Sequence, residues 1–350
     1  MSDTKQVHLA TRTRSFELRR ELVDGIRRIF LRTGVLPFVL TIAVLGFGIA
    51  SPRMFSLDNI VNVARNSSYL IIVSMGQMLC LLSRGMDLSV SSTTAVVSIS
   101  ATLVMSHMFH LYPDMPALAI GTGIAAGLAV SILIGAVNGA GISLLNVNPF
   151  IMTVGMLSIL SGAALQLSGG MPIYDLPPQF SQWFAYAAPL GIPMPVIFVS
   201  ALFLILCYVL YMTPLGRYIY AIGGNESAAH LAGIRTKLYT AITYVLCSFI
   251  VGIGSILLTA RVATGEPTLG QGLLIQSITA VVIGGVSLFG GIGRVGNVVL
   301  GALFVIIVSN GMNLNRIGSY TQEIVLGTIL IIAVVVDMLR NRLLRHQRLE

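Results

Sequence analysis

Asp87 is the first residue of this chain whose type and position could do chemistry. It stands in S-R-G-M-D-L-S-V, between two strongly apolar runs. An ionisable group at membrane depth is costly and is a functional candidate by default. Three roles are open for Asp87: carrying a proton, pairing with Arg84, or capping the next helix by accepting a backbone N–H from Ser89 or Val90. Asp is a preferred capping residue, which favours capping or pairing over proton carriage.

The cysteines and histidines predict no metal site. Cys80, Cys207 and Cys247 each lie inside an apolar run, and nothing in their spacing pairs them. Buried small side chains are therefore favoured over a disulfide or a metal site. His107 and His110 have a spacing that can bind a metal, but solvated loop histidines explain them better. We predict no catalytic residue, no metal and no cofactor.

The sequence also lacks the motif that would let it hydrolyse ATP through a phosphate-binding loop. That loop requires G-x-x-x-x-G-K-[ST]. The chain has only two lysines, Lys5 and Lys237, and neither follows a glycine. Neither H-E-x-x-H nor G-x-S-x-G occurs, so no catalytic motif of a membrane enzyme is present.

The composition predicts a polytopic membrane protein. The chain is 55% hydrophobic and only 10% charged, with a mean hydropathy of +0.88, whereas soluble domains carry about 25% charged residues. The 36 glycines fit this class because small residues let membrane helices approach closely. The net charge of +8 lies mainly in tails and loops and forms no basic soluble domain, so we expect no nucleic-acid partner.

Ten stretches are apolar enough to be candidate spans, since about 20 apolar residues cross a bilayer as a helix. They are 34–50, 69–83, 90–110, 117–138, 149–167, 195–212, 238–258, 274–291, 297–313 and 322–339. With the N-terminus inside, 17 of the 21 Lys and Arg residues fall on the cytoplasmic side, as the positive-inside rule requires. We predict an all-α polytopic membrane protein of about ten transmembrane helices with both termini cytoplasmic.

This count divides the chain into a basic cytoplasmic tail over 1–32, one membrane domain over 33–339 and a second basic cytoplasmic tail over 340–350.

Two regions share the same order of an apolar run, a glycine-containing break and a second apolar run. They are Tyr69–Ser100 and Leu274–Phe304. Such segments are typical of discontinuous helices around a transport path. The spans carry few charges but several uncharged polar side chains. Most of these fit hydrogen bonds between helices, while a minority could line a path for a neutral polar substrate.

The interval Thr213–Lys237 is the longest polar stretch between two spans. Asn225 is a good helix N-cap, Glu226 suits the first turn of a helix, and Gly233 is a natural stop. A short cytoplasmic helix with small residues on one face follows from this pattern. It could dock in a groove of another protein, or it could be an ordinary connecting helix; the residues alone leave both open.

Several motifs together resemble the permease subunits of ribose-type ABC importers, in the superfamily that also holds branched-chain amino acid permeases. In chain order they are G-M-D-L-S-V (85–90), N-P-F-I-M-T-V-G-M (148–156), T-P-L-G-R (213–217), A-I-G-G-N-E-S-A-A-H-L-A-G-I (221–234), A-V-V-I-G-G-V-S-L-F-G-G (280–291), N-G-M (310–312) and A-V-V-V-D (333–337). The resemblance runs from Leu57 to Asp337. Ser91 and Asn297 depart from the usual pattern, which leaves the particular sugar open.

The resemblance implies that 225–234 is the coupling helix that seats in a cytoplasmic ABC ATPase. The residues expected to couple are Arg217, Asn225, Glu226, Ala228, Ala229 and Gly233. The candidates for the translocation path or for helix breaks are Gln77, Asp87, Ser89, Asn148, Pro149, Gly284, Gly285, Gly290, Gly291 and Asn310.

The same resemblance implies a multi-pass protein of the bacterial inner membrane. Its partners would be the ATPase, a periplasmic sugar-binding protein and a second permease copy, identical or paralogous. The implied function is import of a monosaccharide or related polyol. The alternatives are a permease of the same superfamily for branched-chain amino acids or nucleosides, and an autonomous secondary carrier or channel.

Overall fold

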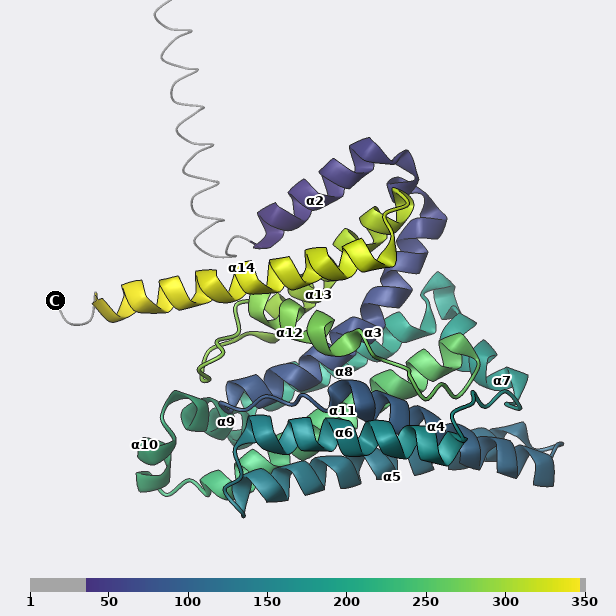
Figure 1. The fold of residues 1–350 in the computed structure, drawn as a ribbon, viewed down its shortest axis with the longest axis horizontal. Coiled ribbons are helices and arrows are strands. Elements are labelled where there is room, and N and C mark those ends of the chain that lie inside the picture. The colour runs from purple at the N-terminus through teal and green to yellow at the C-terminus, as the bar shows by residue number, and fades with distance from the viewer. Residues whose placement is uncertain (1–35, 347–350) are drawn as a thin grey trace, which may run out of the picture.

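The computed structural model describes residues 36–346, and this part of the chain is built from helices (Figure 1). The helices that overlap the ten predicted spans are α2 (Leu36–Ala50), α3 (Leu57–Leu82), α4 (Val90–Leu111), α5 (Pro116–Ser143), α6 (Pro149–Ser168), α8 (Met194–Met212), α11 (Thr236–Val262), α12 (Leu273–Ile283), α13 (Val295–Leu314) and α14 (Ser319–His346). The connecting segments hold η1 (Pro52–Phe55), α7 (Pro178–Ser181), η2 (Gln182–Tyr186), η3 (Pro189–Gly191), α9 (Pro214–Gly224) and α10 (Glu226–Leu231).

The N-terminal tail predicted over 1–32 lies outside the described residues. The C-terminal tail predicted over 340–350 begins inside α14, which continues to His346. Within residues 36–346 no strand forms, and an isolated antiparallel bridge joins Ile173 to Gly265. The predicted all-α class is therefore confirmed for the described part of the chain.

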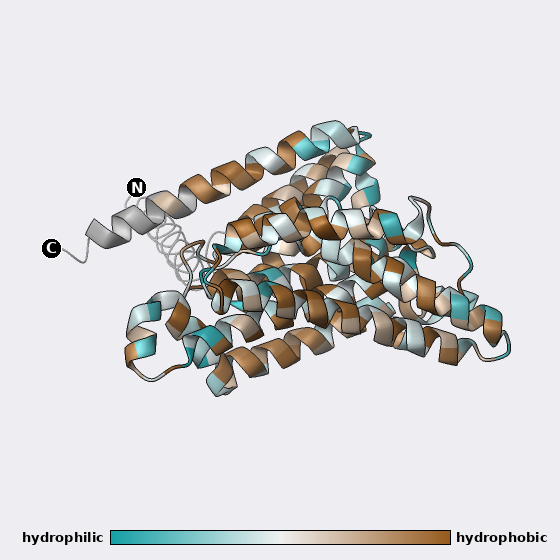
Figure 2. Ribbon diagram, turned by 60° about the horizontal axis from the view of Figure 1, so that its bottom comes forward, coloured by the Kyte–Doolittle hydropathy of each residue, from teal (hydrophilic) through white to brown (hydrophobic). Residues whose placement is uncertain are grey.

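Six of the described helices are long and apolar enough to cross a membrane: α4, α5, α6, α8, α11 and α13. The apolar parts of α2, α12 and α14 are shorter. Hydrophobic positions run along the long helices, while hydrophilic ones gather near the helix ends and in the connections (Figure 2). The chain is thus a multi-pass membrane protein. The count of ten crossings and the orientation of the termini stay predictions.

Helix α3 is much longer than the predicted span 69–83. It begins at Leu57, because Ser56 caps it by accepting the Asn59 N–H at 3.4 Å. Its first turns carry polar side chains, so the hydropathy pattern placed them in an external loop. From Ser67 to Leu82 every residue is buried, as expected for a helix in the centre of a bundle.

Helices α3 and α11 form the centre of the molecule. α11 packs against α3, α4 and α5, and α3 also packs against α12 and α13. In Figure 1 this pair lies between a group made of α4, α5 and α6 and a group made of α2, α13 and α14. At Gly139 of α5, an added Cβ would come 2.8 Å from the carbonyl oxygen of Ala241. Glycine lets these two helix backbones meet directly.

The helical structure is interrupted at both predicted places. α3 ends at Leu82 and α4 begins at Val90, while α12 ends at Ile283 and α13 begins at Val295. The predicted span 274–291 was therefore too long. Its second half is a loop in which glycines adopt left-handed backbone conformations, for example Gly290 with a φ of 86°. An 11-residue helix such as α12 is about 17 Å long, which is short of the roughly 30 Å bilayer core.

Candidate functional site

The short helix α10 forms as the sequence predicts. The Asn225 side chain accepts the Ala228 N–H at 3.0 Å and so caps the helix. Glu226 is the first helical residue, where its charge suits the positive end of the helix dipole. Gly233 ends the helix with a φ of 84°, and its N–H donates to the His230 carbonyl at 2.9 Å.

The two faces of α10 differ in a way that the sequence did not show. Glu226 and Ala228 are exposed, but Ala229 is buried. Ala229 therefore seats the helix on the protein body and does not offer its side chain to a partner. Leu231 is 87% exposed and was missed as a candidate. The sequence feature that could have identified it is a large apolar side chain within the polar interval Thr213–Lys237.

The surface beside α10 is hollowed. A cavity of about 440 Å³ is lined by Tyr218, Ala232, Gly233, Ile234, Arg235 and Tyr239. The rings of Tyr218 and Tyr239 form one wall, with their centroids 4.7 Å apart. Arg217, another predicted coupling residue, is exposed on α9 next to Tyr218. The polar interval thus presents an exposed helix, an apolar side chain and a concave surface together.

The N-cap of α10 can be tested separately from any docking role. Replacing Asn225 with Ala removes the acceptor for the Ala228 N–H and should destabilise the first turn by about 1 kcal/mol. We expect roughly fivefold faster amide exchange over residues 226–231 at that free-energy cost. Asn225→Asp keeps a capping oxygen and should exchange at the original rate. Equal exchange rates in the two variants would contradict the cap.

The end of α9, directly before α10, touches both helix breaks. We call this contact the junction; it comprises residues 82–85 at the end of α3, 222–225 at the end of α9 and 287–293 in the loop after α12. The Gly291 N–H donates to the Leu82 carbonyl at 3.0 Å. A Cβ on Gly223 would overlap the same carbonyl oxygen, and one on Gly291 would come 2.7 Å from the Gly224 nitrogen. Three backbones therefore meet here with no side chain between them.

The Arg84 side chain links the segments of the junction by hydrogen bonds. Its Nε donates to the Phe289 carbonyl at 3.1 Å, and its Nη2 donates to the Gly224 carbonyl at 3.4 Å. Its φ of 66° lies in the left-handed region, which is uncommon for a residue other than glycine. Both guanidinium bonds go to backbone carbonyls, so Arg84 does not serve Asp87 as the paired cation that the sequence left open.

Tyr220 adds a further link between α9 and the second break. Its hydroxyl donates to the Gly293 carbonyl at 2.8 Å. Burial, and next the neighbouring Tyr211, raise the pKa of the Tyr220 phenol well above its ordinary value. The hydroxyl therefore keeps its proton and remains a donor throughout the physiological pH range.

Asp87 orders the first break. Its Oδ1 accepts the Ser89 backbone N–H at 2.9 Å, one of the two bonds expected, and it also accepts the Ser89 hydroxyl. The N-cap of α4 is Ser89 and not Asp87, so these bonds fix the turn before the helix. The Asn138 amide of α5 donates to the same hydroxyl oxygen at 3.0 Å. These bonds position the residues that precede α4, and Asp87 itself is almost fully buried.

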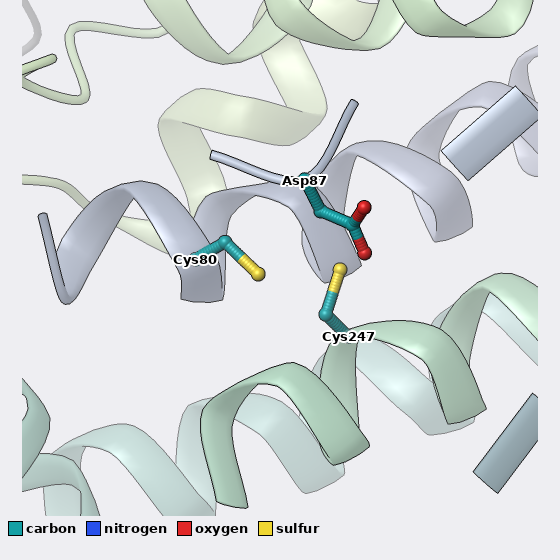
Figure 3. Close-up of side chains that lie close together, drawn as sticks. All are labelled: Cys80, Asp87 and Cys247. Carbon is teal, nitrogen blue, oxygen red and sulfur yellow. The ribbon is translucent and has the colours of Figure 1, made fainter. Parts of the chain in front are cut away.

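The structure brings together residues that lie far apart in the sequence. Cys80 of α3 and Cys247 of α11 point toward Asp87, and the three side chains form one buried group (Figure 3). Their ligand-capable atoms all lie within 4.8 Å of one another. Cys207 lies on α8 and is not part of this group. All three cysteines are free, and Cys80 and Cys247 are buried as predicted, whereas Cys207 is only partly buried. The spacing did not show that Cys80 and Cys247 lie next to each other.

The other predicted path and break residues are dispersed. Asn148 caps α6 by accepting the Phe150 N–H at 2.9 Å, and Pro149 is the first residue of that helix. Asn310 exchanges hydrogen bonds with Asn59 at the far end of α3. Gln77 is fully buried on α3, and neither the oxygen nor the nitrogen of its amide has a hydrogen-bond partner in the described part of the chain. Gly284 and Gly285 begin the second break, and Gly290 and Gly291 belong to the junction.

Comparisons with known proteins match most of the chain. Residues 59–334 match the model of the family described as branched-chain amino acid transport system / permease component. The ribose import permease protein of Escherichia coli strain K12 is 36% identical over 291 residues, which cover 82% of this chain and 88% of the relative. The D-allose transport system permease protein of the same strain is 34% identical over 306 residues, or 87% and 91% of the two chains.

A further relative is the L-arabinose transport system permease protein of the same strain. It is 33% identical over 315 residues, which cover 90% of this chain and 93% of the relative. No solved structure matches the chain.

Proposed function

Because the chain belongs to the branched-chain amino acid transport system / permease component family, we propose that it is the transmembrane subunit of an ABC importer for a monosaccharide or related polyol. The observation that carries this proposal is the identity of 33–36% to ribose, allose and arabinose permeases over most of both chains. As a permease subunit it is a transport component and not an enzyme. ATP hydrolysis then belongs to a partner chain.

We propose three protein partners: a cytoplasmic ABC ATPase, a periplasmic sugar-binding protein, and a second permease copy or paralogue. The bacterial inner membrane is the compartment in which such partners meet. The exposed helix α10 is the element proposed to enter the ATPase. Its support is the cap at Asn225, the glycine stop at Gly233 and the exposed side chain of Leu231.

The junction supplies a route from the ATPase to the transport path. α10 begins at Glu226, two residues after Gly224, whose carbonyl Arg84 binds. The same arginine binds the carbonyl of Phe289 in the second break. Backbones in direct contact cannot move independently, because close-packed interiors transmit displacement. We infer that a shift of α10 moves both breaks together and, through them, α4 and α13.

The membrane interior suits a neutral polar substrate. Gln77 of α3 has a buried amide whose oxygen and nitrogen lack partners among the described residues. Such a group is costly unless it is paired for part of the time. An amide can accept from and donate to a hydroxyl, which is the chemistry that a polyol presents. Gln77 is therefore our first candidate for the path.

Reconstitution tests the proposed function. The chain, its ATPase and the second permease copy are placed in liposomes, and ATP hydrolysis is measured with sugar-loaded and with sugar-free binding protein. We expect the loaded form to stimulate hydrolysis and to drive sugar uptake. Uptake by the permease chains alone, without the ATPase, would instead support the autonomous carrier. Stimulation only by an amino-acid-loaded binding protein would support the branched-chain amino acid alternative.

A further inference from the structure

The buried group of Cys80, Asp87 and Cys247 joins three separate parts of the fold. Cys80 lies in the last turn of α3, Asp87 in the break before α4, and Cys247 in the middle of α11. The two cysteines are 0% exposed and Asp87 is 1% exposed. Figure 3 shows both sulfur atoms directed toward the carboxylate, and all ligand-capable atoms lie within 4.8 Å of one another.

The group contains one polar atom that no described residue satisfies. Asp87 Oδ1 accepts both bonds from Ser89, but Oδ2 has no partner among residues 36–346. The hydroxyl of Tyr244, one turn before Cys247 on α11, is also buried next to this group, close to the backbone of Met86. The Tyr244 hydroxyl lies against the first break, because a Cβ added to Gly85, two residues before Asp87, would overlap it. An unsatisfied buried polar group destabilises a fold, so an occupant that binds Oδ2 would stabilise this one.

The donor set indicates which occupant fits. Two thiolates and one carboxylate are ligands that Zn²⁺ uses in proteins, whereas Ca²⁺ and Mg²⁺ prefer oxygen atoms alone. Zinc bonds of about 2.3 Å to sulfur and 2.0–2.2 Å to oxygen place the donors of a tetrahedral site roughly 3.5–3.8 Å apart. Side-chain shifts of about 1 Å would bring the present group to that spacing. The paired bonds from Ser89 hold the carboxylate and leave Oδ2 free, as the outer partners of metal ligands commonly do.

A disulfide between the two sulfur atoms explains less. It would leave Asp87 Oδ2 without a partner among the described residues, while adding no positive charge near the carboxylate. A divalent cation would bind the carboxylate and both sulfur atoms at once, with each thiol releasing its proton to the solvent as the metal binds. It leaves a fourth position that the Tyr244 hydroxyl or a water molecule can fill.

We propose that Cys80, Asp87 and Cys247 form a zinc site that ties the first helix break to α11. The site adjoins the junction, because Leu82 and Arg84 lie between Cys80 and Asp87 in the chain. A bound ion would hold these residues in the positions that contact the end of α9. This inference is independent of the transport proposal, since metal binding needs neither the ATPase nor a sugar.

The test uses the full chain purified in detergent, with zinc measured by elemental analysis after dialysis. We expect about one zinc per chain in the unchanged protein and in the control Cys207→Ser, and at most a tenth of that in Cys80→Ser and Cys247→Ser. Asp87→Asn should bind zinc more weakly. A zinc chelator should lower the unfolding temperature of the unchanged protein and of Cys207→Ser, without affecting the other two serine variants.

Cobalt(II) provides a readout that needs no variant to fold. Incubated with the chelator-treated, unchanged protein, it should give the thiolate-to-cobalt charge-transfer band and the intense visible bands of a tetrahedral site. Absence of these bands, together with less than a tenth of a zinc per chain, would overturn the site. So would zinc bound equally by Cys80→Ser and Cys207→Ser, because the metal would then be elsewhere.

Discussion

Replacing Leu231 with Asp is expected to weaken binding of the partner ATPase by tenfold or more. Leu231 is 87% exposed on the short helix α10, so its side chain is free to enter a groove of the partner. Burying a leucine contributes about 1.5–3 kcal/mol, and each 1.4 kcal/mol is tenfold in affinity. A carboxylate at this position adds a desolvation cost. The measurement is a titration of the ATPase into liposomes that hold the variant, followed by ATP hydrolysis.

Leu190→Asp is the matched control for this experiment. Leu190 is 100% exposed and lies in η3, which follows α7 and η2, and Figure 1 shows α7 far from α10. The substitution is chemically identical, so general effects on expression or insertion should be shared. We expect Leu190→Asp to keep the original ATPase affinity. Equal weakening by both variants would show that Leu231 has no special part in docking.

Replacing Gly223 with Ala is expected to damage the junction severely. The added Cβ would overlap the carbonyl oxygen of Leu82 and the backbone nitrogen of Gly291. Overpacking costs about 1–3 kcal/mol where side chains can adjust. Here the neighbours are backbone atoms, so we expect a cost of at least about 3 kcal/mol or a displaced junction. The rate of ATP hydrolysis should then be the same with and without the sugar-loaded binding protein.

Gly224→Ala separates this effect from the general effect of alanine in α9. Gly224 is the next residue of the same helix, and a Cβ there would meet nothing within 4 Å. Alanine is favoured over glycine inside helices by up to about 1 kcal/mol, so this variant should be as stable as the original or slightly more stable. Measuring thermal unfolding and coupling for both variants tests the prediction. Similar losses in the two would mean that the close backbone approach is unimportant.

Local features of this chain could be predicted because their causes lie within a few residues. α10 begins after Asn225 and ends before Gly233, as expected. An N-cap and a left-handed glycine each set the end of the helical turn next to them. Apolar runs likewise located the helices, because burial in lipid needs a continuous apolar length. Where polar side chains were tolerated on a helix, as at the start of α3, the same reasoning placed the boundary too late.

Contacts between distant segments could not be predicted in this way. The bond between Arg84 and Gly224 spans 140 residues of chain, and the cluster of Cys80, Asp87 and Cys247 depends on how α11 packs against α3. Hydropathy records that a residue is buried but not which residue it meets. The motifs, by contrast, identified the family correctly because several short patterns occur in one order.

By itself the sequence determined that this is a multi-pass helical membrane protein, which family it belongs to, and where its short capped helix lies. Capping carries that information because it depends only on neighbouring residues. Composition and motif order carry it because they can be read along the sequence without knowing which segments are in contact. Only the tertiary structure decided that Ala229 faces inward while Leu231 faces outward, and that the breaks near Asp87 and Gly291 meet beside α10. Those outcomes depend on the packing of helices against one another, which brings backbones into contact only where glycine leaves room.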